Sequence, residues 1–97
     1  MSSEQKHKDK IIGILSVLFP KAKIYLFGSR ARGTHRDASD IDIAIDAGSK
    51  LSFSQVGEAS DTLNALNIPY KMDVVDMHLI PEDMKKMILQ DGILWKK

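Results

Sequence analysis

The chain has 97 residues, of which 43% are hydrophobic and 28% are charged, and its formal net charge is +1. This length predicts a single domain, residues 1–97, with a modest core, and the composition excludes a disordered chain. The lack of cysteine excludes disulfides and thiolate metal sites. The polar start MSSEQKHKDK is not a signal peptide and no apolar run reaches the roughly 18 residues of a membrane span, so we expect a cytoplasmic protein without membrane contact.

Charge is distributed unevenly along the chain. Residues 1–36 hold eight Lys and Arg against two carboxylates, whereas residues 37–97 hold six Lys against eleven carboxylates. Solvated helix faces of opposite sign would explain the asymmetry. A cationic rim facing an acidic cluster would explain it equally well, and would suit a polyanion that carries its own divalent metal.

The first half of the chain predicts a helix and two strands. Residues 6–19 place Ile11, Leu15 and other apolar residues at helical spacing, and Pro20 ends this run. The segment AKIYLFG is rich in β formers and predicts a buried strand, followed by a turn or one helical turn through SRARGTHRDAS. The segment DIDIAID alternates between aspartates and isoleucines, so its acidic residues share one face of a strand and its isoleucines share the other.

The second half predicts a helix, a strand and a further helix. Apolar residues recur every three or four positions from Phe53 to Leu66, and Ser52 and Gln55 match a capping box, so we expect a helix ending near Asn67. YKMDVVDM predicts a strand, a helix follows from Pro81, and ILWKK predicts a short edge strand. The order α-β-β-α-β-α is that of an α/β (α+β) fold, with a small mixed sheet and helices packed on one face.

Asp40 and Asp42 predict a cation site. Side chains two residues apart on a strand lie about 6.5–7 Å apart on the same face, where two carboxylates repel each other and raise each other's pKa. A divalent metal such as Mg²⁺ would relieve that repulsion, because it takes hard oxygen ligands. An acidic exposed sheet face is the simpler interpretation of this motif when it is taken alone.

The dipeptide Gly28-Ser29 predicts an anion site at the end of the first strand. Glycine permits unusual backbone angles or a close ligand approach, and the N–H groups of a following helical turn attract phosphates. Arg30, Arg32 and Arg36 would lie around this site. A plain turn is the commoner explanation of a lone Gly-Ser pair.

A two-metal site needs a third carboxylate. Asp73 and Asp76 are three residues apart on the third strand, so only one of them shares a face with Asp42. Asp73 lies among β formers and is preferred, whereas Asp76 is expected to serve only solubility at the strand end. Asp46 is expected to lie too far along its strand.

The combined pattern resembles a known family. A strand ending in Gly28-Ser29, ten further residues and then Asp40-Ile41-Asp42 is similar to the GS-x10-DxD motif of the DNA polymerase beta nucleotidyltransferase superfamily. The segment FGSRARGTHRDASDIDIAI resembles that of its minimal nucleotidyltransferase (MNT) branch. The resemblance covers nearly the whole chain, and it implies the nucleotidyltransferase fold.

This resemblance implies a role for each residue of the site. Gly28 and Ser29, with Arg30 and Arg32 beside them, would bind the phosphates of a nucleoside triphosphate. Three aspartates would be catalytic and would bind two Mg²⁺ ions, with Mn²⁺ as an alternative: Asp40, Asp42 and Asp73. A hydroxyl would attack the α phosphorus and release pyrophosphate, with ATP as the expected substrate.

The resemblance also implies a partner. MNT proteins resemble antitoxins that neutralise small helical HEPN toxins, in some cases by AMPylating a tyrosine, so a hetero-oligomer is expected. Two alternatives stay open: a non-catalytic module that neutralises its partner by contact, and a transferase for a small molecule or an RNA end. We expect no direct nucleic-acid binding, because the sequence has no basic aromatic stripe. His35 is expected to be a solvated loop residue, and neither His7 nor His78 shows a functional pattern.

Overall fold

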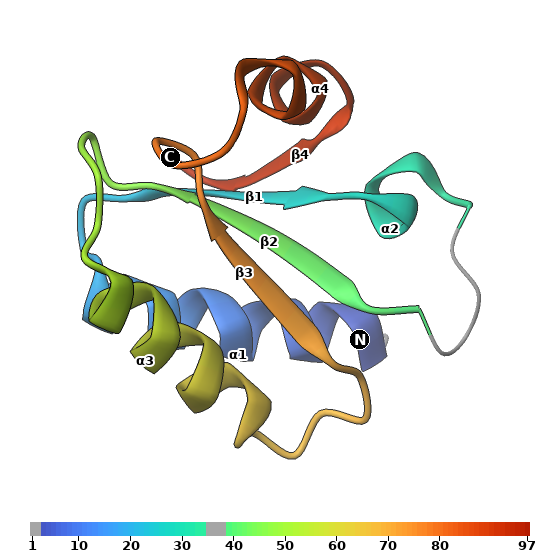
Figure 1. The fold of residues 1–97 in the computed structure, drawn as a ribbon. Coiled ribbons are helices and arrows are strands. Elements are labelled where there is room, and N and C mark those ends of the chain that lie inside the picture. Colours follow the sequence, from blue (N-terminus) through green and yellow to red (C-terminus); the bar gives the residue numbers. More distant parts are fainter. Residues whose placement is uncertain (1–2, 35–38) are drawn as a thin grey trace.

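The computed structural model describes residues 3–34 and 39–97, so His35 and Arg36 lie outside the described residues. Within these ranges the elements are α1 (Ser3–Leu18), β1 (Lys23–Phe27), α2 (Ser29–Arg32), β2 (Ile41–Asp46), α3 (Phe53–Asn64), β3 (Met72–Asp76), α4 (Glu82–Asp91) and β4 (Ile93–Lys96). The expected mixed α/β order is confirmed, including the terminal strand and the short helix after Gly28 (Figure 1). In the described part of the chain, no helix is long and apolar enough to cross a membrane.

The strands form one mixed sheet in the order β3-β2-β1-β4. β1 is antiparallel to both β2 and β4, whereas β2 and β3 are parallel. A parallel pair needs a crossover connection, and α3 supplies it. The parallel alignment means that β2 and β3 begin at the same end of the sheet, where β1 ends and α2 starts (Figure 1).

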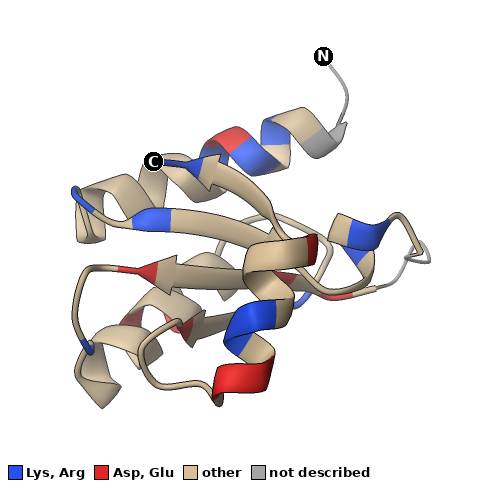
Figure 2. Cartoon of the chain, turned by 90° about the horizontal axis from the view of Figure 1, so that it is seen from above, with Lys and Arg blue, Asp and Glu red and all other residues tan. Residues whose placement is uncertain are grey.

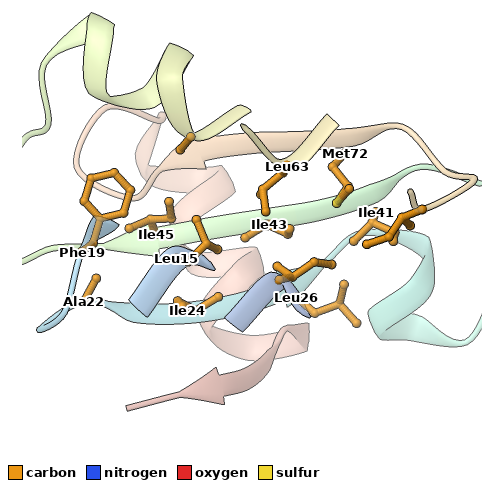
Figure 3. Close-up of a cluster of buried hydrophobic side chains, with 13 residues drawn as sticks. Leu15, Phe19, Ala22, Ile24, Leu26, Ile41, Ile43, Ile45, Leu63 and Met72 are labelled. Carbon is orange, nitrogen blue, oxygen red and sulfur yellow. The ribbon is translucent and has the colours of Figure 1, made fainter. Parts of the chain in front are cut away.

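The alternation in β2 decides which residues enter the core. Ile41, Ile43 and Ile45 are buried in the main apolar cluster, together with residues of α1 and α3 (Figure 3). Ala44 lies on the other face and packs in a second cluster with Ile88 of α4. The sheet therefore carries α1 and α3 on one face and α4 on the other (Figure 1). This differs from the expectation of helices on one face. The chain passes from β3 to the second face of the sheet, where the apolar side of α4 packs in the cluster of Ala44 and Ile88.

The helix boundaries follow the expected signals with one exception. The capping box of α3 is confirmed, since the Ser52 hydroxyl accepts the Gln55 N–H at 3.1 Å and the Gln55 side chain accepts the Ser52 N–H at 2.8 Å. α4 lies between Pro81 and Gly92 as expected. However, α3 ends at Asn64 instead of near Asn67. The Asn64 side chain exchanges two hydrogen bonds with the backbone of Met72, which ties the end of this helix to β3.

Asp76 is a structural residue of the core, so the expectation that it serves only solubility is wrong. Its side chain is buried, with 2% of the residue surface exposed. One carboxylate oxygen accepts the Leu51 N–H at 2.7 Å and the other accepts the His78 N–H at 2.9 Å. The carboxylate thus joins the loop before α3 to the turn after β3.

We predict that Asp76→Ala destabilises the fold, because it leaves two N–H groups without their acceptor. The expected loss in the free energy of unfolding is about 2–4 kcal/mol, measured by urea denaturation. Asp61→Ala on the exposed side of α3 is the matched control and should change stability by less than about 0.5 kcal/mol. Equal effects of the two substitutions would contradict a structural role for Asp76.

Candidate active site

The parallel pairing of β2 and β3 brings the predicted carboxylates together. Asp42 is the direct partner of Asp73 in the sheet register, and partners in a parallel pair share a face. This is the face of Ala44, opposite to the buried isoleucines. Asp40 lies two residues before Asp42, just ahead of the strand. The sheet therefore places three negative charges at the end where α2 begins.

Charge and burial both act on Asp42. Partial burial raises the pKa of Asp42, and the negative charges of Asp73 and Asp40 raise it further. Arg32 acts in the opposite direction and lowers this pKa, but the net shift is upward. Figure 2 shows the basic residues of α2 and acidic residues of the sheet at this same end of the molecule. Among the described residues, burial and the neighbouring carboxylates therefore outweigh the effect of Arg32 on the pKa of Asp42.

The backbone conformation at position 28 and the atoms around it both require a glycine there. Its φ of 78° and ψ of −155° are angles that essentially only glycine adopts. A Cβ atom at this position would overlap the Oδ2 of Asp42. The turn that carries Ser29 therefore lies directly against the acidic strand, next to the carboxylate of Asp42.

Ser29 begins the single turn of α2. The turn is closed by hydrogen bonds from the Arg32 N–H to the Gly28 carbonyl at 3.2 Å and from the Thr34 N–H to the Ser29 carbonyl at 2.9 Å. Gly33 ends it in the left-handed conformation. The first N–H groups of a helix have no acceptor within the helix, so this turn presents donors beside the carboxylates.

The two arginines of α2 point in different directions. Arg32 is exposed and acts electrostatically on Asp42. Arg30 instead donates to the Ser39 carbonyl oxygen from Nε at 3.2 Å and from Nη2 at 2.8 Å, and its guanidinium carbon lies 4.3 Å from the centre of the Tyr70 ring. Of this pair, Arg32 is the one that lowers the pKa of Asp42.

The residues fit a divalent cation in their chemistry but do not form a closed cage. Among residues 3–34 and 39–97, no three acidic or histidine side chains converge closely enough to hold an ion. Asp73 is directed toward Lys71, whose Nζ lies 3.8 Å from Oδ1. This pair is largely exposed and is worth at most about 1 kcal/mol, so it is easily exchanged for a stronger cation. Hard oxygen donors with uncompensated charge are the ligands that Mg²⁺ takes.

A histidine–carboxylate pair lies at the opposite end of β2. His78 Nε2 is 2.7 Å from Asp46 Oδ1. Burial alone would raise the pKa of Asp46, but the hydrogen bonds from His78 and from the Gly48 N–H, with nearby positive charges, lower it overall. The expectation that Asp46 lies away from the Asp42 cluster agrees with this placement. His78, which showed no functional pattern in the sequence, holds the turn after β3 against β2.

Two supporting residues gave no recognisable signal in the sequence. Asn64 bonds the backbone of Met72, directly before Asp73, at the outer edge of β3. The Tyr70 ring lies beneath the Arg30 guanidinium and meets the His7 ring edge-on, with 5.8 Å between the two ring centroids. Both contacts join segments that are distant in sequence, so no local pattern predicts them.

The fold is that of the nucleotidyltransferases. A crystal structure of a toxin-antitoxin with AMP-PNP is 31% identical, with a TM-score of 0.80 over 91% of this chain and 71% of that chain. A structure of a tri-AMPylated Shewanella oneidensis HEPN toxin in complex with MNT antitoxin is 28% identical, with a TM-score of 0.76 over 94% of this chain and 70% of that chain.

The sequence comparison gives the family. The profile described as "Polymerase beta, Nucleotidyltransferase" matches residues 9–96, so the chain belongs to the polymerase beta nucleotidyltransferase family. It is 33% identical to "Protein adenylyltransferase MntA" of Shewanella oneidensis over 92% of this chain and 64% of the relative. It is 29% identical to "Probable protein adenylyltransferase MntA" of Haemophilus influenzae over 77% of this chain and 66% of the relative. The chain spans just under two thirds of the length of these relatives.

We predict that Asp42→Asn stabilises the metal-free protein at neutral pH. Because the pKa of Asp42 is raised by folding, the folded state binds this proton more tightly than the unfolded chain does, and the charged carboxylate opposes folding as pH rises through the raised pKa. In thermal unfolding with a chelator, the Tm advantage of the variant should grow with pH. Added Mg²⁺ should then raise the Tm of the wild type and leave the Tm of the variant unchanged. A variant with a lower Tm than the wild type at pH 7, in the presence of chelator, would contradict this prediction.

We further predict that Gly28→Ala damages the site. The strained backbone alone costs about 1–3 kcal/mol, and the new methyl group must displace Asp42. Gly13→Ala is the matched control, because Gly13 lies in the interior of α1 with open space around it and alanine should add about 0.5–1 kcal/mol of stability. Chemical denaturation measures both; a tolerated Gly28→Ala would argue against the close approach to Asp42.

Proposed function

We propose that this chain is a metal-dependent nucleotidyltransferase that moves AMP from ATP to a hydroxyl of a partner protein. The observation that carries the proposal is the pairing of Asp42 with Asp73 on one sheet face, directly against the Gly28-Ser29 turn. Two carboxylates held side by side disfavour the folded state unless a cation joins them. A triphosphate with its metal supplies both the cation and an anion for the turn.

Each residue has a stated task in this proposal. Asp40, Asp42 and Asp73 hold Mg²⁺, or Mn²⁺ in its place, and the metal neutralises the charge of the triphosphate when bound. Gly28 and Ser29 face the phosphates with backbone N–H groups, and Arg32 adds positive charge. Asp73 also accepts the proton of the attacking hydroxyl. The new P–O bond forms at the α phosphorus, and the bond to the pyrophosphate leaving group breaks.

We propose that the acceptor is a tyrosine hydroxyl of a small helical HEPN-type toxin, which makes the chain an antitoxin in a hetero-oligomer. The support is the likeness to an MNT antitoxin whose HEPN toxin partner is tri-AMPylated, together with two relatives named as protein adenylyltransferases. In this proposal the described residues bind the nucleotide, and the partner supplies the acceptor hydroxyl.

The expected result of the direct test is transfer of label to the partner. The full chain is incubated with Mg²⁺, a HEPN-type protein and ATP labelled at either the α or the γ phosphate. Only the α label should appear on the partner, with a mass increase of one adenylate per site. Asp42→Asn should reduce transfer by at least about a hundredfold, because it removes a metal ligand, whereas the exposed Asp61→Asn should leave it unchanged.

A contact-only antitoxin is the second candidate, and one observation favours it: the three carboxylates are not drawn into a closed cation site, since Asp73 faces Lys71. In that case the double variant Asp40→Ala, Asp42→Ala would still protect cells from the toxin as well as wild type does. Loss of protection in a variant that stays folded and still binds the toxin would exclude contact alone and support the transferase.

A further inference from the structure

Arg30 and Arg32 leave the single turn of α2 on different sides. Residues two apart in a helix are separated by about 200° around its axis. Arg32 acts on Asp42, whereas the guanidinium of Arg30 lies over Tyr70 and bonds the Ser39 carbonyl. Two arginines that look equivalent in the sequence therefore have different surroundings.

The contacts of Arg30 use the geometry that distinguishes arginine from lysine. Two N–H groups of one planar guanidinium, Nε and Nη2, converge on a single carbonyl oxygen at 3.2 and 2.8 Å. The guanidinium carbon also lies over the Tyr70 ring, 4.3 Å from its centroid. A lysine ammonium is a point charge and does not reproduce the forked pair of donors. The hydrogen bonds are partly buried, so solvent competes with them less than at an exposed site.

These contacts join the three segments that carry the candidate active site. Arg30 itself follows Ser29 in the phosphate-facing turn. Ser39 directly precedes Asp40, and Tyr70 lies three residues before Asp73. One side chain thus touches the turn and the approaches to both acidic strands. Close by, the start of β2 is hydrogen-bonded to the residue before β3: the Ile41 N–H donates to the Lys71 carbonyl at 2.9 Å.

We propose that Arg30 is a positioning residue that fixes the Gly28-Ser29 turn relative to the carboxylates, and that it is not a phosphate ligand. In the nucleotide-free protein the guanidinium is already engaged by the Ser39 carbonyl and the Tyr70 ring. The proposal rests on the proposed function for its kinetic consequence only. Its structural consequence is independent of catalysis: without Arg30, the turn and the start of β2 move separately.

The first test is amide hydrogen exchange on the nucleotide-free full chain. Arg30→Met keeps the apolar stem and removes the guanidinium, and Arg30→Lys keeps the charge and removes the planar fork. In both variants, exchange in residues 29–34 and 39–42 should rise roughly tenfold, while α3 and β4 stay unchanged. Tyr70→Phe keeps the ring and should behave as wild type, whereas Tyr70→Leu should raise exchange in the same two segments. Lys21→Met, an exposed cation after α1, is the matched control.

The second test separates positioning from phosphate contact. If transfer is observed in the wild type, Arg30→Lys should lower kcat by about tenfold to a hundredfold, while the KM for ATP changes by less than about threefold. Unchanged exchange in both segments overturns the proposal, as does an exchange increase spread over the whole chain. A loss of ATP affinity above tenfold with AMP affinity unchanged would identify Arg30 as a phosphate ligand instead. If the wild type transfers nothing, the proposed function fails, and the exchange result still decides the role of Arg30.

Discussion

The parallel alignment of β2 and β3 is the constraint on which the site depends. Strand alternation and burial leave no other arrangement: once the three isoleucines of β2 enter the core, Asp42 must lie on the opposite face. The register then sets Asp73 beside it. The burial of apolar side chains that fixes this register therefore also places two like charges side by side. Partial burial of Asp42, and then the negative charges of Asp73 and Asp40, raise the pKa of Asp42.

The sequence was sufficient to predict most of this arrangement, because the signals are local. Period-2 alternation identifies β2 and both of its faces without reference to any other segment. The same rule shows that only one of Asp73 and Asp76 joins Asp42. It does not reveal the role of Asp76, because the N–H of Leu51 that this carboxylate accepts belongs to a loop twenty-five residues away in the sequence. A buried carboxylate is recognised only when its donors are located.

The same distinction between local and distant information explains the two arginines of α2. Residue type and spacing place both Arg30 and Arg32 near the Gly28-Ser29 turn. The direction of each side chain is set by what lies beside it, and for Arg30 this is the Tyr70 ring and the Ser39 carbonyl. The position of α4 has a similar cause. Its amphipathic pattern indicates a buried side but does not specify which face of the sheet covers that side.

The backbone of the site is more fully determined than its acidic side chains. The Gly28 conformation, the β2–β3 register and the Asn64 bonds to Met72 fix where the turn and the two strands lie. Of the acidic side chains, Asp73 forms a largely exposed and weak pair with Lys71, with 3.8 Å between Oδ1 and Nζ. Since like charges repel, the side chains gain from converging only when a cation is present. The fold thus supplies the positions of the carboxylates in advance, and in the proposed function the metal and its triphosphate would complete their orientation.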